Sequence, residues 1–164
     1  LFLEVDGFNK ISHLLQGDDS IFLNICKKYK KVNVGFSDSP DSFVSSKNFK
    51  SWLSFFSQRV RWAGDANIMW KYNKSFFIII FSTFSSSLFL FYLLFNNFIN
   101  YLFLVLVIKY FFEYLLYLFG NKKLFLKTNN LDFFLWFFIQ IPYIILVGSL
   151  SFLSNFIAWR GRRF

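Results

Sequence analysis

Three side chains in the segment QRVRW can face one ligand from a single side of a helix. Gln58, Arg61 and Trp62 stand three and four residues apart, so an α-helix carries all three on one face. Together they offer an amide, a planar cation and a flat aromatic ring to one bound molecule. The alternative interpretation is that they anchor the helix at a membrane surface. Anchoring explains Trp62 well and Gln58 poorly.

A pair of carboxylates, Asp18 and Asp19, stands directly before a second helical pattern. Ile21, Ile25 and Tyr29 recur at helical spacing after the pair, which predicts a helix with acids at its start. Carboxylates in that place usually accept hydrogen bonds from the free backbone N–H groups of the first turn. On spacing alone, we therefore interpret the pair as a helix cap.

The elements around the acidic pair predict a mixed α/β fold for residues 1–46. The opening LFLEVDGF has the pattern of a short strand that enters a glycine turn, and KVNVGF, from residue 31 to 36, alternates like an edge strand. The stretch SDSPDS, from residue 37 to 42, has the composition of a turn.

An amphipathic helix is predicted over residues 47–62, with a linker to residue 74. Its apolar residues return every three or four positions, and its polar residues lie elsewhere. Two tryptophans with cations nearby suit a helix that lies among the head groups of membrane lipids. The recurring apolar residues are Phe49, Trp52, Leu53, Phe56 and Val60.

Three apolar segments in the second half of the chain are long enough to cross a hydrocarbon core about 30 Å thick. They cover residues 75–95, 98–119 and 133–159. We therefore predict an integral membrane protein with about three membrane helices over residues 75–159, followed by a basic tail at residues 160–164.

Basic residues predict how these segments are oriented. If QRVRW is cytoplasmic, the loop with Lys122, Lys123 and Lys127 is cytoplasmic too, as the positive-inside tendency requires. A third crossing then leaves the arginines of the tail outside, against that tendency. We favour this crossing; the alternative is a hairpin that breaks near Pro142 and Gly148.

The second apolar segment contains two charges, Lys109 and Glu113, which lie four residues apart and so on one helical face. A lone charge at mid-bilayer costs roughly 2.5 kcal/mol or more, and an opposite neighbour lowers that cost. We favour a structural ion pair that faces the other membrane helices. The alternative is a polar contact with a lipid-linked substrate.

Composition excludes several other classes of protein. A net charge of +9 is compatible with nucleic-acid binding, but the basic residues lie beside apolar segments, where anionic lipid head groups explain them more simply. The single cysteine, Cys26, excludes an internal disulfide. With His13 as the single histidine, the chain cannot assemble a Cys/His metal site.

Taken together, DGF, GDD and QRVRW followed by apolar segments resemble the C-terminal half of a membrane-bound family 2 glycosyltransferase. The resemblance covers essentially the whole chain, and the closing WRGRRF is similar to the tails of bacterial members. Two positions depart from the family pattern. Asp6 stands where the family usually has the first of two glycines, and Asp18 stands where it commonly has glutamate.

The resemblance implies a fold and a cofactor. Residues 1–46 would be the C-terminal part of an α/β, Rossmann-like GT-A catalytic domain, and the nucleotide-binding half would precede Leu1. Mg²⁺ or Mn²⁺ would bind the donor diphosphate through residues of that preceding half.

The resemblance also implies the activity: inverting transfer of a sugar from a nucleotide-sugar donor to a lipid-linked or glycan acceptor. The site would lie at the cytoplasmic face of a bacterial inner membrane. Asp19 would be the general base, Gln58 and Arg61 would bind the diphosphate, and Trp62 would stack on an acceptor sugar. The remaining acceptor-side residues would be Gly7, Phe8 and Asp18.

Two other functions remain open. One is a processive polysaccharide synthase of the same family, although three membrane segments are few for a product channel. The other is a small basic membrane protein that acts as a structural subunit of a larger assembly. The ordered GDD and QRVRW motifs favour the glycosyltransferase over this subunit.

Overall fold

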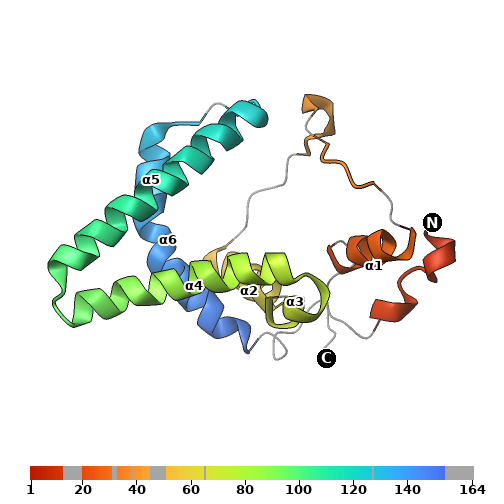
Figure 1. Ribbon diagram of the computed structural model, residues 1–164, viewed down its shortest axis with the longest axis horizontal. Helices are drawn as coiled ribbons and strands as arrows, with labels where there is room; N and C mark the ends of the chain where they lie inside the picture. The colour runs from red at the N-terminus through yellow and green to blue at the C-terminus, as the bar shows by residue number, and fades with distance from the viewer. Residues whose placement is uncertain are drawn as a thin grey trace. The chain divides into compact units, whose positions relative to one another are not determined.

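The computed structural model of the protein describes residues 1–12, 20–30, 33–37, 39–44, 51–64, 66–126 and 128–153. Within these residues the backbone forms six α-helices and three short 3-10 helices, η1 to η3, and no strand (Figure 1). The chain divides into two compact units. Unit 1 contains Leu1–Phe36, Phe49–Phe81 and Val147–Phe164, and unit 2 contains Ser37–Asn48 and Ser82–Leu146.

The prediction of an α/β fold is wrong for the part of residues 1–46 that the structure describes, which is helical or irregular. The opening segment forms the 3-10 helix η1 (Leu3–Val5) instead of a strand, with hydrogen bonds between residues three and four apart. Residues 33–36, the described part of the expected edge strand, have no regular structure, and residues 31 and 32 lie outside the described residues. A strand is stable only beside a partner that pairs its N–H and C=O groups, and no described residue provides that partner.

The predicted turns are confirmed. After η1, Asp6 and Gly7 both have left-handed backbones, with φ of 66° and 53°. The SDSPDS stretch contains η3 (Pro40–Ser42), in which the Ser42 hydroxyl donates a hydrogen bond of 2.7 Å to the carbonyl of Ser39. Proline fixes φ near −65°, which suits the start of such a turn.

Unit 1 has a small apolar core between α1 (Ser20–Lys30) and α3 (Ala66–Tyr72). The helix predicted after the acidic pair is therefore confirmed. Ile21 of α1 and Met69 of α3 are buried together with Ile11 of η2 (Asn9–Ile11). The Asn24 side-chain amide of α1 donates a hydrogen bond to the carbonyl of Tyr72, at the end of α3. The partly buried residues around this core are Phe22, Ile25, Ile68, Tyr72 and Phe77.

The predicted amphipathic helix is α2 (Trp52–Gly64), which contacts α3. Its first expected turn, including Phe49, lies outside the described residues. Ser51 begins the helix, because its hydroxyl accepts a hydrogen bond of 3.2 Å from the Ser54 N–H, and the Ser54 hydroxyl accepts one of 3.3 Å from the Ser51 N–H. Val60 is buried at 4% exposure, so the apolar side of α2 faces the protein at this position.

Among the described residues, three helices are long and apolar enough to cross a membrane, which supports the prediction of a membrane protein. They are α4 (Lys74–Phe95), α5 (Ile99–Lys123) and α6 (Asn130–Ser151). Each has 22 residues or more, hence a length of roughly 33 Å or more, against a hydrocarbon core of about 30 Å. A turn at Asn96 and Asn97 joins the first two.

α6 is continuous through Pro142 and Gly148, so the helix does not break where the hairpin alternative requires it. Asn129 begins α6, since its side-chain oxygen accepts a hydrogen bond of 3.0 Å from the Leu131 N–H. Asn73 begins α4 in the same manner, accepting from the Phe76 N–H at 3.1 Å. Asparagine is favoured at both positions because it satisfies N–H groups that the first helical turn leaves open.

In unit 2, aromatic rings join α5 to α6. The ring centroid of Tyr110 is 5.0 Å from that of Phe137, and the centroid of Tyr117 is 4.7 Å from that of Phe133. Phe137 is 1% exposed and Phe133 is 8% exposed. Edge-to-face and tilted ring pairs at these distances add to the stabilisation that burial provides.

Candidate functional site

The predicted ligand-binding face lies on α2, where Gln58, Arg61 and Trp62 follow one another at helical spacing. Gln58 and Arg61 are partly buried, whereas Trp62 is 47% exposed. The buried Val60 marks the opposite side of this helix. The motif residues therefore lie on a face of α2 that is not part of the apolar core of unit 1.

The side-chain oxygen of Gln58 is buried and accepts no hydrogen bond from the described residues. Leaving a buried amide oxygen unpaired costs about 1–3 kcal/mol, and such atoms in folded proteins usually have a partner. A hydroxyl or amide of a bound ligand would supply the missing donor. Among the described residues, the Gln58 oxygen therefore has no hydrogen-bond donor, which is compatible with a role in ligand binding.

Arg59, which the sequence analysis did not select, contacts Trp62 directly. Its Cζ atom is 4.7 Å from the centroid of the Trp62 ring and 5.1 Å from that of Phe55. Both distances are within the range of cation–π attraction. The signal was present in the sequence, because Phe55 precedes Arg59 by four residues and Trp62 follows it by three.

The predicted acceptor-side residues Gly7 and Phe8 lie in the turn after η1. Gly7 has φ of 53°, and its N–H donates a hydrogen bond of 2.9 Å to the carbonyl of Phe2. A Cβ atom at Gly7 would lie 2.9 Å from the Phe2 ring, so only glycine fits without a shift. Phe8 packs on Phe22 of α1, with ring centroids 4.9 Å apart.

Asp6 occupies the position where the family pattern has glycine, and it adopts the left-handed backbone that glycine takes most readily. Aspartate is among the few other residues that visit this region. The Asn9 side-chain amide donates a hydrogen bond of 2.8 Å to the Asp6 carboxylate. Asp6 is therefore compatible with a left-handed position in this turn.

Asp18 and Asp19 lie outside the described residues, so the structure reports neither their conformation nor their contacts. Ser20 opens α1 as the next residue of the chain. The roles of the acidic pair as cap and as catalytic carboxylate remain predictions.

Packing within unit 1 links the elements that carry the three motifs. The glycine turn contacts α1 through Phe8 and Phe22. α1 shares the apolar core with α3 through Ile21 and Met69, and α3 contacts α2. The turn, the helix after the acidic pair and the QRVRW helix thus belong to one packed unit.

No protein-family model, curated protein or solved structure matches the chain. The likeness to family 2 glycosyltransferases therefore depends on the motif residues and their positions.

Among the described residues, no three His, Cys, Asp or Glu side chains come together in a group that could hold a metal ion. These residues do not form a site for the Mg²⁺ or Mn²⁺ that the resemblance implies. That the ligands precede Leu1 remains a prediction.

A second polar cluster lies in unit 2 and confirms the predicted ion pair within α5. Lys109 pairs with one carboxylate oxygen of Glu113, and the side-chain amide of Gln140 from α6 donates to the other. The Lys109 ammonium also lies 5.8 Å from the centroid of the Phe137 ring. Both oxygens of Glu113 are therefore engaged by the protein itself, which favours the structural role over contact with substrate.

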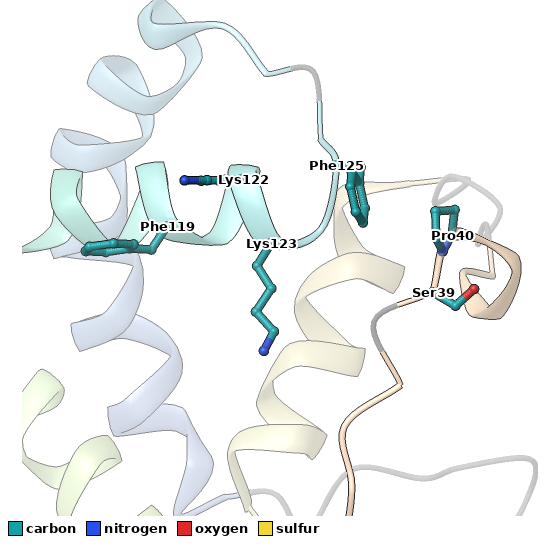
Figure 2. Close-up of a pocket in the computed structure, with 6 residues that line it drawn as sticks. All are labelled: Ser39, Pro40, Phe119, Lys122, Lys123 and Phe125. Atoms are coloured by element: carbon teal, nitrogen blue, oxygen red, sulfur yellow. The ribbon is translucent and has the colours of Figure 1, made fainter.

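An open hollow of about 740 Å³ lies in unit 2, lined by Ser39, Pro40, Phe119, Lys122, Lys123 and Phe125. The side chains of Lys122 and Lys123 point in different directions (Figure 2). Because their ammonium groups do not converge, the hollow does not form a built site for one anion. The α2 face of unit 1 remains the stronger candidate.

Proposed function

We propose that the protein is the membrane-proximal part of an inverting family 2 glycosyltransferase. It would transfer a sugar from a nucleotide-sugar donor to a hydroxyl of a lipid-linked or glycan acceptor. One observation carries this proposal: Gln58, Arg61 and Trp62 share one face of α2, and α2 packs on α3, which leads directly into the first span-length helix. This position, directly before the first span-length helix, supports a site for membrane-delivered acceptors.

Each motif residue has a defined part in the proposed reaction. The acceptor hydroxyl attacks the anomeric carbon while the bond from that carbon to the donor diphosphate breaks, which inverts the configuration. Asp19 takes the proton of the hydroxyl. Arg61 and the Gln58 amide bind the diphosphate and offset the charge that grows on it as it leaves.

Trp62 would bind the acceptor. The C–H groups of a pyranose face match the flat indole ring, and the exposure of Trp62 leaves room for such a stack. Gly7, Phe8 and Asp18 would line the same side of the site. Their proposed role is supported by the packing of Phe8 on α1, the helix that follows the acidic pair.

The proposed location is the cytoplasmic face of a bacterial inner membrane. With α2 on this side, α4 crosses outward and α5 returns, so that Lys122 and Lys123 at the end of α5 are cytoplasmic. This arrangement follows the positive-inside tendency. Limited addition is favoured over processive synthesis, since three described span-length helices are few for a product channel.

The test uses the full-length gene product in membranes and measures transfer of radiolabelled sugar. Arg61→Lys keeps the positive charge but removes the planar fork that binds two phosphate oxygens. We expect it to lower transfer substantially, while the same replacement in the basic tail, Arg162→Lys, leaves transfer unchanged. Equal activity of both variants would contradict the proposal.

A non-enzymatic membrane subunit is the second candidate function. It is favoured by the helical or irregular conformation of every described residue, since an α/β catalytic fold is not seen among them. If the protein is a non-enzymatic subunit, no nucleotide-sugar should give a labelled product. Arg61→Lys should then change only the amount of protein in the membrane. Labelling that depends on Arg61 would exclude it.

A further inference from the structure

A guanidinium lies against two aromatic rings on α2. The Cζ atom of Arg59 is 4.7 Å from the Trp62 centroid and 5.1 Å from the Phe55 centroid. Spacings of four and three residues place both rings on the strip of helix that Arg59 occupies. The ring contacts hold the cation because the negative face of an aromatic ring attracts it.

These ring contacts fix where the guanidinium sits. The Nε atom of Arg59 is buried, and no acceptor among the described residues meets it. Its position therefore follows from stacking on Phe55 and Trp62 instead of a hydrogen bond at Nε. By the same contact, the Arg59 guanidinium lies against one side of the Trp62 ring.

Trp62 remains 47% exposed although Arg59 stacks on it. The indole is thus oriented by one neighbour and still open to a ligand. A side chain that is already ordered loses less conformational entropy when the ligand binds, which strengthens binding.

We propose that Arg59 is a positioning residue for the acceptor: it holds the Trp62 indole ready to stack on a pyranose ring. This inference rests on the proposed function and adds a residue outside the Gln58, Arg61 and Trp62 set. Loss of one cation–π contact at a partly exposed site corresponds to a roughly two- to five-fold change in an equilibrium constant. We expect the affinity for the acceptor to change, because Arg59 acts through Trp62.

The test compares Arg59→Gln and Arg59→Lys in the full-length gene product in membranes. Sugar transfer gives KM for the acceptor, KM for the donor and kcat. Independently, fluorescence anisotropy reports the rotation of Trp62 in a background in which every other tryptophan is replaced by phenylalanine. The matched control is Lys71→Gln, which in the transfer assay removes the Lys71 ammonium that lies 5.3 Å from the ring centroid of Trp70 on α3. In the anisotropy background position 70 carries phenylalanine, so there the same variant removes a cation beside that ring.

We expect Arg59→Gln to raise the acceptor KM roughly two- to five-fold, with kcat and the donor KM within about a factor of two. Trp62 anisotropy should fall in Arg59→Gln and stay closer to the parent value in Arg59→Lys, which keeps a cation. Lys71→Gln should change neither quantity.

An unchanged Trp62 anisotropy in Arg59→Gln would overturn the proposal. A raised donor KM with an unchanged acceptor KM would overturn it too, and would make Arg59 a direct phosphate ligand. If the parent protein transfers no sugar, the proposed function fails, and anisotropy alone then decides whether Arg59 orients Trp62.

Discussion

The side-chain amide of Gln140 on α6 donates a hydrogen bond to the Glu113 carboxylate on α5. Since Lys109 pairs with the other oxygen of that carboxylate, one partly buried cluster connects two span-length helices. Lys109 and Glu113 are only 10% and 26% exposed. In a bilayer core no water replaces these partners, so each depends on the others.

Removal of Glu113 should therefore destabilise the membrane region. Glu113→Ala leaves the Lys109 ammonium without its counter-ion, and a lone charge in the bilayer costs roughly 2.5 kcal/mol or more. We expect a clear loss of monodisperse protein on size-exclusion chromatography in detergent. The double replacement of Lys109 and Glu113 by leucine removes both charges and should restore the yield.

The same double variant separates structure from substrate binding. A structural pair predicts that sugar transfer returns together with the folded protein. Recovery of folded protein without recovery of transfer would show instead that Lys109 or Glu113 contacts the substrate.

Gln140→Leu should have a smaller effect than Glu113→Ala. It removes one donor but leaves the Lys109–Glu113 pair intact, and hydrogen bonds between membrane helices average about 0.6 kcal/mol. We expect a modest fall in thermal stability, measured by loss of the monodisperse peak after heating. A fall as large as that of Glu113→Ala would mean that Gln140 does more than complete the pair.

Gly7→Ala should destabilise unit 1 by about 1–2 kcal/mol, because alanine is strained in the left-handed region. The new Cβ would also lie 2.9 Å from the Phe2 ring. Gly35→Ala is the matched control, since a Cβ there meets nothing within 4 Å. Chemical denaturation, followed by intrinsic fluorescence, measures the free energy of unfolding of both variants. Equal stability of the two would contradict the structure of this turn.

Periodicity and apolar length predicted the helices well, because both depend on local sequence. The repeat of Ile21 and Ile25 is confirmed in α1, and the first two apolar segments are confirmed as long helices. The third is helical as far as Ser151, and its predicted end at residues 154–159 lies outside the described residues, as does the tail at 160–164. The prediction of strands was wrong for LFLEV and for residues 33–36, the described part of KVNVGF. Short apolar runs fit a strand or a helical turn equally, and the choice depends on a partner strand that local sequence does not reveal.

For the polar residues, spacing revealed contacts within a helix but not between helices. The separation of four residues predicted the Lys109–Glu113 pair, which the structure confirms. The third member, Gln140, comes from another helix 27 residues further along the chain, so no periodicity connects it to Glu113. The contacts of Arg59 with Phe55 and Trp62 follow from the same spacing as the Lys109–Glu113 pair, since they join residues four and three apart in one helix.

Trp62→Ala should weaken use of the acceptor and leave the donor almost unaffected. A nucleic-acid base stacked on an aromatic side chain contributes on the order of 1–3 kcal/mol to binding. A sugar face stacked on Trp62 makes a contact of the same kind. We expect a raised acceptor KM in sugar transfer with a nearly constant donor KM. Trp70→Ala, on α3, is the control; an equal effect of both would mean that these tryptophans only anchor helices at the membrane.

The continuous α6 predicts that the chain crosses the membrane a third time. A cysteine at position 162, introduced as Arg162→Cys after Cys26→Ala, should then react with a membrane-impermeant thiol reagent added outside intact cells. Protection from that reagent, with labelling only after the membrane is opened, would place the tail in the cytoplasm.

The central claim is that this protein takes part in sugar transfer with Asp19 as the base. The most direct measurement is incorporation of radiolabelled sugar by the full-length gene product in membranes, compared between the parent and Asp19→Asn. Removal of a general base typically lowers the rate about 10²- to 10⁴-fold, so Asp19→Asn should be nearly inactive and Asp18→Asn less impaired. Full activity of Asp19→Asn would contradict the account.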